Sequence, residues 1–271
     1  MSSTKGRVQS LLLALMNQRL HGRHAAGRAT NRGNPAPTAE VRAMFDRIAN
    51  VYDPMNSVIS AFQEPRWRKR AVQLAGARPG DRLLDVATGT GKVAADLQAR
   101  AQPAGTVLGV DISPRMIELA KRRFEDRPAL EFVVGDAMAL PTEERSCDAA
   151  TIAFGMRNLP DYRRGFAEMA RSVRVGGRVV CLEIARPWSR PARFLQVWFD
   201  RIVPLLGRVA GQGAAYRYLV RSVQGYPGPD GIAQIMREAG LVNVTWYGMS
   251  GGIVTLHVGT VAEDEPSAAL E

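Results

Sequence analysis

Three acidic residues and two glycines stand where a ligand could be held. Asp85, Asp111 and Asp136 each lie at the end of a short apolar run, and Gly89 and Gly91 follow the first acid. Such runs predict buried strands, and the carboxyl ends of parallel strands meet at one edge of a sheet. Glycines there let the backbone turn tightly and approach a ligand. The acids can accept hydrogen bonds from hydroxyl groups and attract a cation.

The glycine turn leaves two classes of ligand open. Residues 89–94, Gly-Thr-Gly-Lys-Val-Ala, fit the G-x-G-x-x-G/A pattern of dinucleotide sites, but the match alone is weak. Asp85 lies four residues before the first glycine, where its charge would repel a pyrophosphate. An acid there suits S-adenosylmethionine, an adenosine cofactor with sulfonium and ammonium groups. We therefore predict this methyl donor rather than NAD; the alternative for Asp85 is a cap on the next helix.

The two later acids have separate predicted roles. Asp111 is placed to accept hydrogen bonds from a ribose diol, and Asp136 lies where an adenine amino group needs an acceptor. The alternative for Asp136 is a helix cap. Ile112 and Met138 would form apolar edges on either side of the adenine.

Composition is that of a globular protein with one large core. The chain has 271 residues, 46% apolar and 23% charged, and no apolar run approaches the length that spans a membrane. Cys147 and Cys181 are far apart and belong to no C-x-x-C pair. They predict free thiols in a reducing, cytoplasmic compartment, with no disulfide and no metal site.

The positive charge is concentrated at the start of the chain. Residues 1–39 carry six Lys and Arg and no acid, and so account for six of the ten net positive charges. Helical spacing of apolar residues near 8–19 is followed by a Gly/Asn/Pro/Arg-rich linker. We interpret 1–39 as a flexible extension; the alternatives are an anchor to anionic lipid and a transit peptide. Nucleic-acid binding is disfavoured, because no basic patch interleaved with aromatics recurs later.

The remainder predicts one α/β domain over residues 40–261. Two helices, 41–51 and 56–74, are expected to be separated by Tyr52-Asp53-Pro54. Strands then alternate with helices, which predicts a parallel sheet. The strands are expected near 82–87, 106–111, 130–136, 149–154 and 178–185, and the helices near 91–101, 114–125 and 162–173.

The end of the domain breaks this alternation. Residues 187–223 predict an apolar helical insertion, and a last helix near 229–239 precedes a hairpin formed by 242–249 and 253–260. Residues 262–271 are expected to be a flexible tail. A mainly parallel seven-stranded sheet that ends in an antiparallel hairpin is the class I methyltransferase architecture, a Rossmann-like α/β fold.

Four separated segments resemble one enzyme family. They are Phe-Asp-Arg-Ile-Ala-Asn-Val-Tyr-Asp-Pro-Met-Asn (45–56), Phe-Gly-Met-Arg-Asn-Leu (154–159), Tyr-Arg-Tyr-Leu (216–219) with Ser222, and Gly-Gly-Ile-Val-Thr-Leu-His (251–257). The chain resembles the quinone-biosynthesis C-methyltransferases, the family of demethylmenaquinone methyltransferase and 2-polyprenyl-6-methoxy-1,4-benzoquinol methylase. Thr88 and Lys92 depart from the usual family pattern, which could alter the methionine end of the cofactor pocket.

The resemblance implies methylation of a ring carbon of a prenylated quinol, in menaquinone or ubiquinone biosynthesis. S-adenosylmethionine would be the methyl donor, and the acceptor is either a naphthoquinol or a benzoquinol. The residues that match the family's cofactor site are Asp85, Gly89, Thr90, Gly91, Asp111, Asp136 and Ala137.

The expected catalytic residues are Arg157, Asn158 and Tyr52. A hydroquinone ring carbon becomes nucleophilic when an adjacent hydroxyl loses its proton, so the site must stabilise a phenolate. Arginine is a poor base, and we assign Arg157 to stabilising this oxyanion; the alternative is a structural salt bridge. His257, which lies in an apolar strand pattern, is expected in the core or at an edge rather than in catalysis.

The apolar insertion has two interpretations. Residues 194–209 could form a groove for the prenyl tail, open to the bilayer through peripheral membrane contact, or they could serve core packing or a homodimer interface. Other functions left open are methylation of a different small molecule, NAD-linked oxidoreduction, and a catalytically silent scaffold of the same fold.

Overall fold

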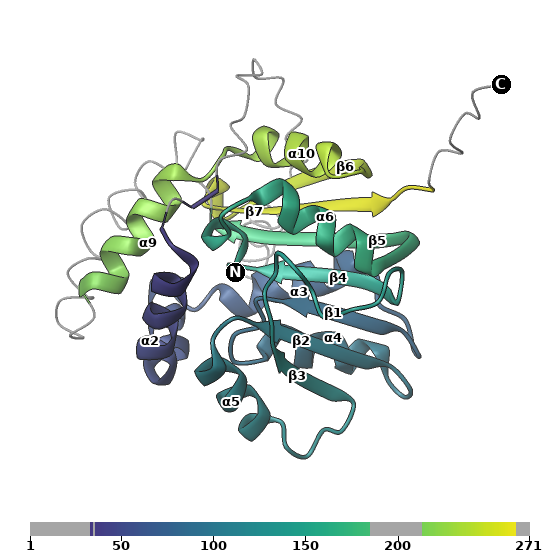
Figure 1. Ribbon diagram of the computed structural model, residues 1–271, viewed down its shortest axis with the longest axis horizontal. Coiled ribbons are helices and arrows are strands. Elements are labelled where there is room, and N and C mark those ends of the chain that lie inside the picture. The colour runs from purple at the N-terminus through teal and green to yellow at the C-terminus, as the bar shows by residue number, and fades with distance from the viewer. Residues whose placement is uncertain (1–32, 35, 185–212, 264–271) are drawn as a thin grey trace, which may run out of the picture.

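The computed structural model describes residues 33–34, 36–184 and 213–263. One seven-stranded sheet runs through this part, with the strand order β3-β2-β1-β4-β5-β7-β6 (Figure 1). Neighbouring strands among the first five are parallel, whereas β7 is antiparallel to β5 and to β6. The predicted fold is therefore confirmed. The strands are β1 (Arg82–Val86), β2 (Thr106–Asp111), β3 (Leu130–Val134), β4 (Cys147–Ala153), β5 (Val173–Ile184), β6 (Leu241–Met249) and β7 (Val254–Val261).

Helices cover both faces of the sheet, which explains why its central strands are mostly apolar. Leu83 and Leu84 of β1 belong to two different core clusters, because successive side chains of a strand point to opposite faces. The first cluster includes residues of α3 (Glu64–Ala75), α4 (Lys92–Ala101) and α5 (Pro114–Arg123). The second includes residues of α6 (Tyr162–Ser172) and α10 (Pro229–Glu238).

Most element boundaries lie within a few residues of those expected. The largest difference among the strands is β5, which begins at Val173 instead of near residue 178. The predicted hairpin is present, and a short 3-10 turn at Ser250–Gly252 connects its strands. Both cysteines are buried and free.

The helix before the sheet differs from the prediction. A single helix, α2 (Thr38–Ile59), continues through Tyr52-Asp53-Pro54, and the break before α3 lies at residues 60–63. Proline removes one backbone hydrogen bond from a helix. Here the neighbouring Asp53 makes polar contacts outside α2, which offset that loss. The helix ends before Ala61 and Phe62, whose backbones are left-handed, with φ of 47° and 60°.

Only part of the predicted insertion lies within the described residues. Its end forms α9 (Gly213–Gly225), which lies beside α2 at one end of the sheet (Figure 1). Residues 194–209, most of the extension 1–39 and most of the tail 262–271 lie outside the described residues. Among the helices that are described, none has both the length and the apolar character needed to cross a bilayer.

Candidate functional site

A cavity opens at the carboxyl ends of β1, β2 and β4, beneath α2. It encloses about 700 Å³, part of it open to solvent. This is the crevice where the strand order changes direction, the usual ligand site of open α/β sheets. Six predicted site residues line it: Tyr52, Gly89, Asp111, Asp136, Ala137 and Asn158.

Asp111 and Gly89 are joined across the ends of β2 and β1. The Gly89 N–H donates to Asp111 Oδ2 at 2.8 Å, and the Ser113 N–H donates to Oδ1 at 2.9 Å. Burial raises the pKa of Asp111 to about 6, although these hydrogen bonds oppose the shift. Gly89 has a φ of 54°, and a Cβ there would stand 3.8 Å from the Tyr52 ring, between the turn and α2. The turn therefore presents a carboxylate beside open backbone.

Asp85 lies below the cavity rather than in its lining. Its carboxylate is 1% exposed and accepts hydrogen bonds from Thr88 Oγ1 at 2.7 Å and Thr151 Oγ1 at 2.6 Å. Burial raises the pKa of Asp85 to about 6, against these bonds and one from the Ala94 N–H in the first turn of α4. Asp85 therefore braces the glycine turn and the start of α4. Thr88, which departs from the family pattern, points inward to this carboxylate.

The second half of the glycine turn faces α2. Thr90 Oγ1 donates to Asp53 Oδ1 at 2.9 Å, and Lys92 Nζ lies 3.2 Å from the same oxygen. Gly91 has a φ of 80°, and a Cβ there would meet the Phe132 ring at 2.8 Å, so both conformation and space require glycine. The basic residue at position 92 thus has an acidic partner on the helix above it.

The adenine end of the predicted site is formed by the loop after β3. Asp136 Oδ1 accepts a hydrogen bond from the Met138 N–H at 2.8 Å, so this acid stabilises a turn and does not cap a helix. Ile112 lines the cavity as expected. Met138 is buried but is not among the described residues that line it; Met116 of α5 supplies an apolar side chain instead.

The floor of the cavity contains two residues in an uncommon conformation. Ala87 and Phe154, at the ends of β1 and β4, have φ of 51° and 58°. Between them, a Cβ on Gly155 would lie 2.4 Å from Ala87 Cβ. Left-handed backbone at such residues costs energy and is often found at functional sites. The packing of the two loops therefore depends on Gly155.

Tyr52 of α2 and Asn158 of the short turn after β4 bring polar atoms to the cavity. Burial raises the pKa of Tyr52 to about 12, although the charge of Arg157 lowers it, so the phenol is a neutral hydrogen-bond donor. Asn158 Oδ1 accepts from the Tyr218 hydroxyl at 3.0 Å. That hydroxyl in turn accepts from the Asn34 side chain. Tyr218 lies within a family-like segment, but no role was expected for it.

Arg157 forms a buried ion pair with Glu183. Its Nη1 lies 2.6 Å from Glu183 Oε1 and 2.6 Å from the Phe154 carbonyl oxygen, and the Arg157 N–H donates to Glu183 Oε2 at 3.1 Å. Glu183 is fully buried and Arg157 is 7% exposed. Arg157 does not belong to the described lining of the cavity. Arg157 therefore forms a structural salt bridge, which is the alternative to a catalytic role that the sequence left open.

His257 lies in the core of the sheet. It is fully buried in β7, and its Nε2 is 2.9 Å from the Pro229 carbonyl oxygen. Burial lowers its pKa to about 4, so the ring is neutral at ordinary pH. This is the structural position that the strand pattern indicated.

Helix α2 closes the cavity through two acidic side chains that the sequence did not single out. Asp53 lies 2.7 Å from Arg123 Nη1, and Asp46 accepts from Ser113 Oγ at 2.5 Å. Both acids lie in the segment 45–56, and the resemblance of this segment to the family could have pointed to them. Glu183 also gave a signal, because an acid inside a buried strand requires a partner.

The residues fit an adenosine cofactor that carries a positive charge. Asp111 offers a carboxylate to hydroxyl groups, Asp136 adds a second acceptor, and Val110, Ile112 and Met116 supply apolar walls. Gly89 leaves space between the turn and α2. A pyrophosphate at the same place would face these two acids.

Comparisons with known proteins agree with this geometry. A demethylmenaquinone methyltransferase of Symbiobacterium thermophilum is 40% identical over 230 residues, which cover 81% of this chain and 92% of the relative. One from Staphylococcus aureus (strain JH9) is 36% identical over 85% of this chain and 97% of the relative. A solved SAM-dependent methyltransferase of Thermotoga maritima shares the fold, with a TM-score of 0.58 at 19% identity over 81% of this chain and 98% of that one.

The family model called ubiE/COQ5 methyltransferase family matches residues 34–261, which is nearly all of the described structure. This enzyme uses S-adenosylmethionine as its methyl donor. The chain belongs to the ubiE/COQ5 methyltransferase family.

Proposed function

We propose that this enzyme methylates a ring carbon of a prenylated quinol and that its acceptor is demethylmenaquinol. The observation that carries the proposal is the meeting of the cofactor acids Asp111 and Asp136 with the polar groups of Tyr52 and Asn158 in one cavity. The names of the relatives favour a naphthoquinol over a benzoquinol. S-adenosylmethionine, when bound, supplies an already activated methyl group.

The protein's own task is to orient the quinol and favour its deprotonated form. Tyr52 keeps its proton, so its hydroxyl can donate a hydrogen bond to a quinol oxygen, and the Asn158 amide can add a second. Arg157 would act through its charge, since Glu183 and the Phe154 carbonyl already engage its Nη1. Closure by α2 excludes water, which strengthens all these interactions.

A groove between α2 and α9 supports a prenylated acceptor. Val41 borders both this groove and the cavity, and Tyr218 borders the groove while contacting Asn158. Most of its wall is apolar, which suits an isoprenoid chain leaving the ring site. The lining residues are Ala36, Glu40, Val41, Ala43, Met44, Arg47, Ile48, Ala214, Ala215 and Tyr218.

Turnover with defined acceptors tests the proposal. The purified enzyme with S-adenosylmethionine should add one methyl group to short-tailed demethylmenaquinol, detected by mass spectrometry, and act more slowly on the matching benzoquinol. Deletion of the gene should leave a quinone lighter by one methyl. Faster benzoquinol turnover would reassign the acceptor. Binding of S-adenosylmethionine without turnover of either quinol would indicate a different substrate or a silent scaffold. Binding of NAD(H) without binding of S-adenosylmethionine would contradict the cofactor assignment.

A further inference from the structure

Helix α2 carries an exposed apolar stripe on the side away from the cavity. Val51, Pro54 and Val58 follow helical spacing and are all exposed; Val51 and Val58 are 39% and 41% accessible. Phe62 continues the row just past the end of the helix and is 72% exposed. A contiguous row of exposed apolar side chains, unlike a single one, is typical of a surface that binds a partner or a membrane.

The corner that displays Phe62 is firmly held. Ala61 and Phe62 both adopt the left-handed backbone region, which costs energy for non-glycine residues. The Phe62 N–H donates to the Ser57 carbonyl oxygen at 2.8 Å. Nearby, the Trp67 indole N–H donates to Ser250 Oγ at 3.0 Å, which ties α3 to the hairpin turn. The exposed phenyl ring therefore projects from an ordered turn.

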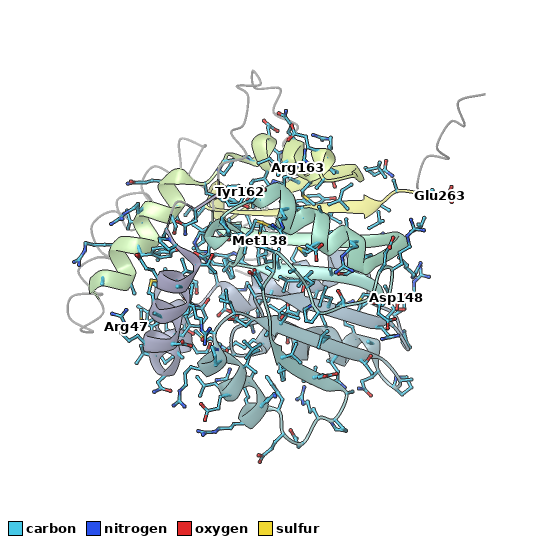
Figure 2. The ribbon with its side chains drawn as sticks, in the orientation of Figure 1. Arg47, Met138, Asp148, Tyr162, Arg163 and Glu263 are labelled. Carbon is cyan, nitrogen blue, oxygen red and sulfur yellow. The ribbon has the colours of Figure 1, made fainter. Side chains whose placement is uncertain are left out.

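The charge around this corner is mainly positive, and the acid Asp96 of α4 is paired there with Arg68. Between residues 54 and 80 the only acid is Glu64, which is buried and paired with Arg68. Arg66 and Lys69 of α3 are exposed. At the opposite end of the row, Arg47 is exposed and projects from α2 away from the sheet (Figure 2).

We propose that Arg47, Val51, Pro54, Val58 and Phe62, which we call the α2 stripe, dock this enzyme on an anionic lipid bilayer. Apolar side chains flanked by Lys and Arg insert at the level of the lipid headgroups. Each basic side chain near the membrane surface is attracted to anionic lipid. Arg47 also borders the groove between α2 and α9. The stripe therefore leads from the membrane toward the catalytic cavity, as a lipid quinol would require. That last step rests on the proposed function, whereas the docking itself does not.

Vesicle binding by the full chain tests the stripe. Phe62→Ser should lower partitioning onto phosphatidylcholine vesicles containing phosphatidylglycerol by about tenfold, the effect expected for withdrawing one aromatic side chain. Val58→Ser should lower it by a smaller factor. Val242→Ser is the matched control, because Val242 is 42% exposed on β6 at the far end of the sheet. Replacing Arg66 and Lys69 by Gln should make partitioning onto these vesicles less dependent on salt concentration.

The outcomes separate docking from catalysis. Melting temperature, affinity for S-adenosylmethionine and turnover of a short-tailed quinol should not change in Phe62→Ser, while turnover of a vesicle-embedded quinol falls. Vesicle binding is read without turnover, so a wrong acceptor assignment leaves it intact. Equal partitioning of Phe62→Ser, Val58→Ser and wild type would overturn the proposal. The proposal would also be overturned if these variants lost self-association in sedimentation while their vesicle binding stayed the same. That result would show that the α2 stripe binds a second copy of the chain.

Discussion

Asp85 and Asp111 lie at the ends of neighbouring strands, and burial raises both pKa values to about 6, but their neighbours separate their roles. Asp85 is enclosed by Thr88 and Thr151, so its hydrogen bonds stay within the protein. Asp111 borders the cavity and accepts hydrogen bonds from backbone N–H groups. Its carboxylate can therefore accept further hydrogen bonds from a ligand. We therefore expect Asp111 to carry more of the cofactor's binding free energy.

The raised pKa of Asp111 predicts pH-dependent cofactor binding. A bound cation favours the ionised carboxylate, so binding releases protons, and affinity should fall by up to about tenfold per pH unit as the pH drops below 6. Asp111→Asn should weaken binding by about 1.5–3 kcal/mol at neutral pH and reduce the pH dependence. Calorimetry from about pH 5 to about pH 8 measures both. An unchanged affinity in a folded variant would remove Asp111 from the site.

The Arg157–Glu183 pair predicts a large stability effect. Arg157→Ala leaves a fully buried carboxylate without its cation, which should cost about 3–5 kcal/mol of unfolding free energy. Arg157→Met combined with Glu183→Gln should recover much of this loss, because no unpaired charge remains. Denaturant unfolding of the three proteins gives the comparison.

Catalysis by Arg157 gives a separate signature in the same proteins. If its charge stabilises the quinol oxyanion, the single-turnover rate per folded molecule should fall about 10²–10³-fold in both variants, with cofactor affinity nearly unchanged. Arg157→Lys should recover only part, because a compact ammonium does not reproduce the planar guanidinium. A normal rate in the stable double variant would leave Arg157 with a purely structural role.

Helix α2 combines three faces in one element: one lines the cavity, one contacts the glycine turn through Asp53, and one is exposed. Tyr52 reaches the cavity, while Asp53 on the same turn contacts Thr90, Lys92 and Arg123. Burial opposes ionisation of Asp53, but the hydrogen bond from Arg123 and the charge of Lys92 hold its pKa below the usual value. Closure of the site is therefore linked to the glycine turn that would hold the cofactor.

Loss of the Asp53 contacts with Lys92 and Arg123 should increase the mobility of α2 without destabilising the core. Asp53→Asn removes two partly buried ion pairs, and we expect cofactor affinity to fall about tenfold, corresponding to roughly 1–2 kcal/mol, with faster hydrogen exchange in α2. Asp96→Asn is the control, since it breaks an ion pair with Arg68 on the outer surface. Equal cofactor affinities for the two variants would show that α2 closes without Asp53.

Taken as a whole, the molecule places its ligand-binding groups at one edge of the sheet and at the adjoining end covered by α2 and α9 (Figure 1). The net charge of +10 favours association with anionic surfaces. Asn34, just before α2, contacts the Tyr218 hydroxyl, and Thr38, the first residue of α2, lines the cavity.

The strand positions, the glycine turn and the three acids could be read from the sequence because their signals are local. Apolar runs, helical spacing and a glycine that needs positive φ depend on neighbouring residues only. The positions of Gly89, Asp111 and Asp136 at one cavity followed from those runs, since parallel strands end at the same edge. The hairpin likewise followed from two runs joined by a Gly-rich turn.

Contacts between distant elements were decided by packing. Pro54 indicated a helix break, but contacts of Asp53 with α4 and α5 outweigh one lost backbone bond. Nothing in the spacing of Arg157 and Glu183, 26 residues apart, shows that they form a buried pair. The free energy of such pairs depends on desolvation and on which faces meet, and only the folded chain sets both.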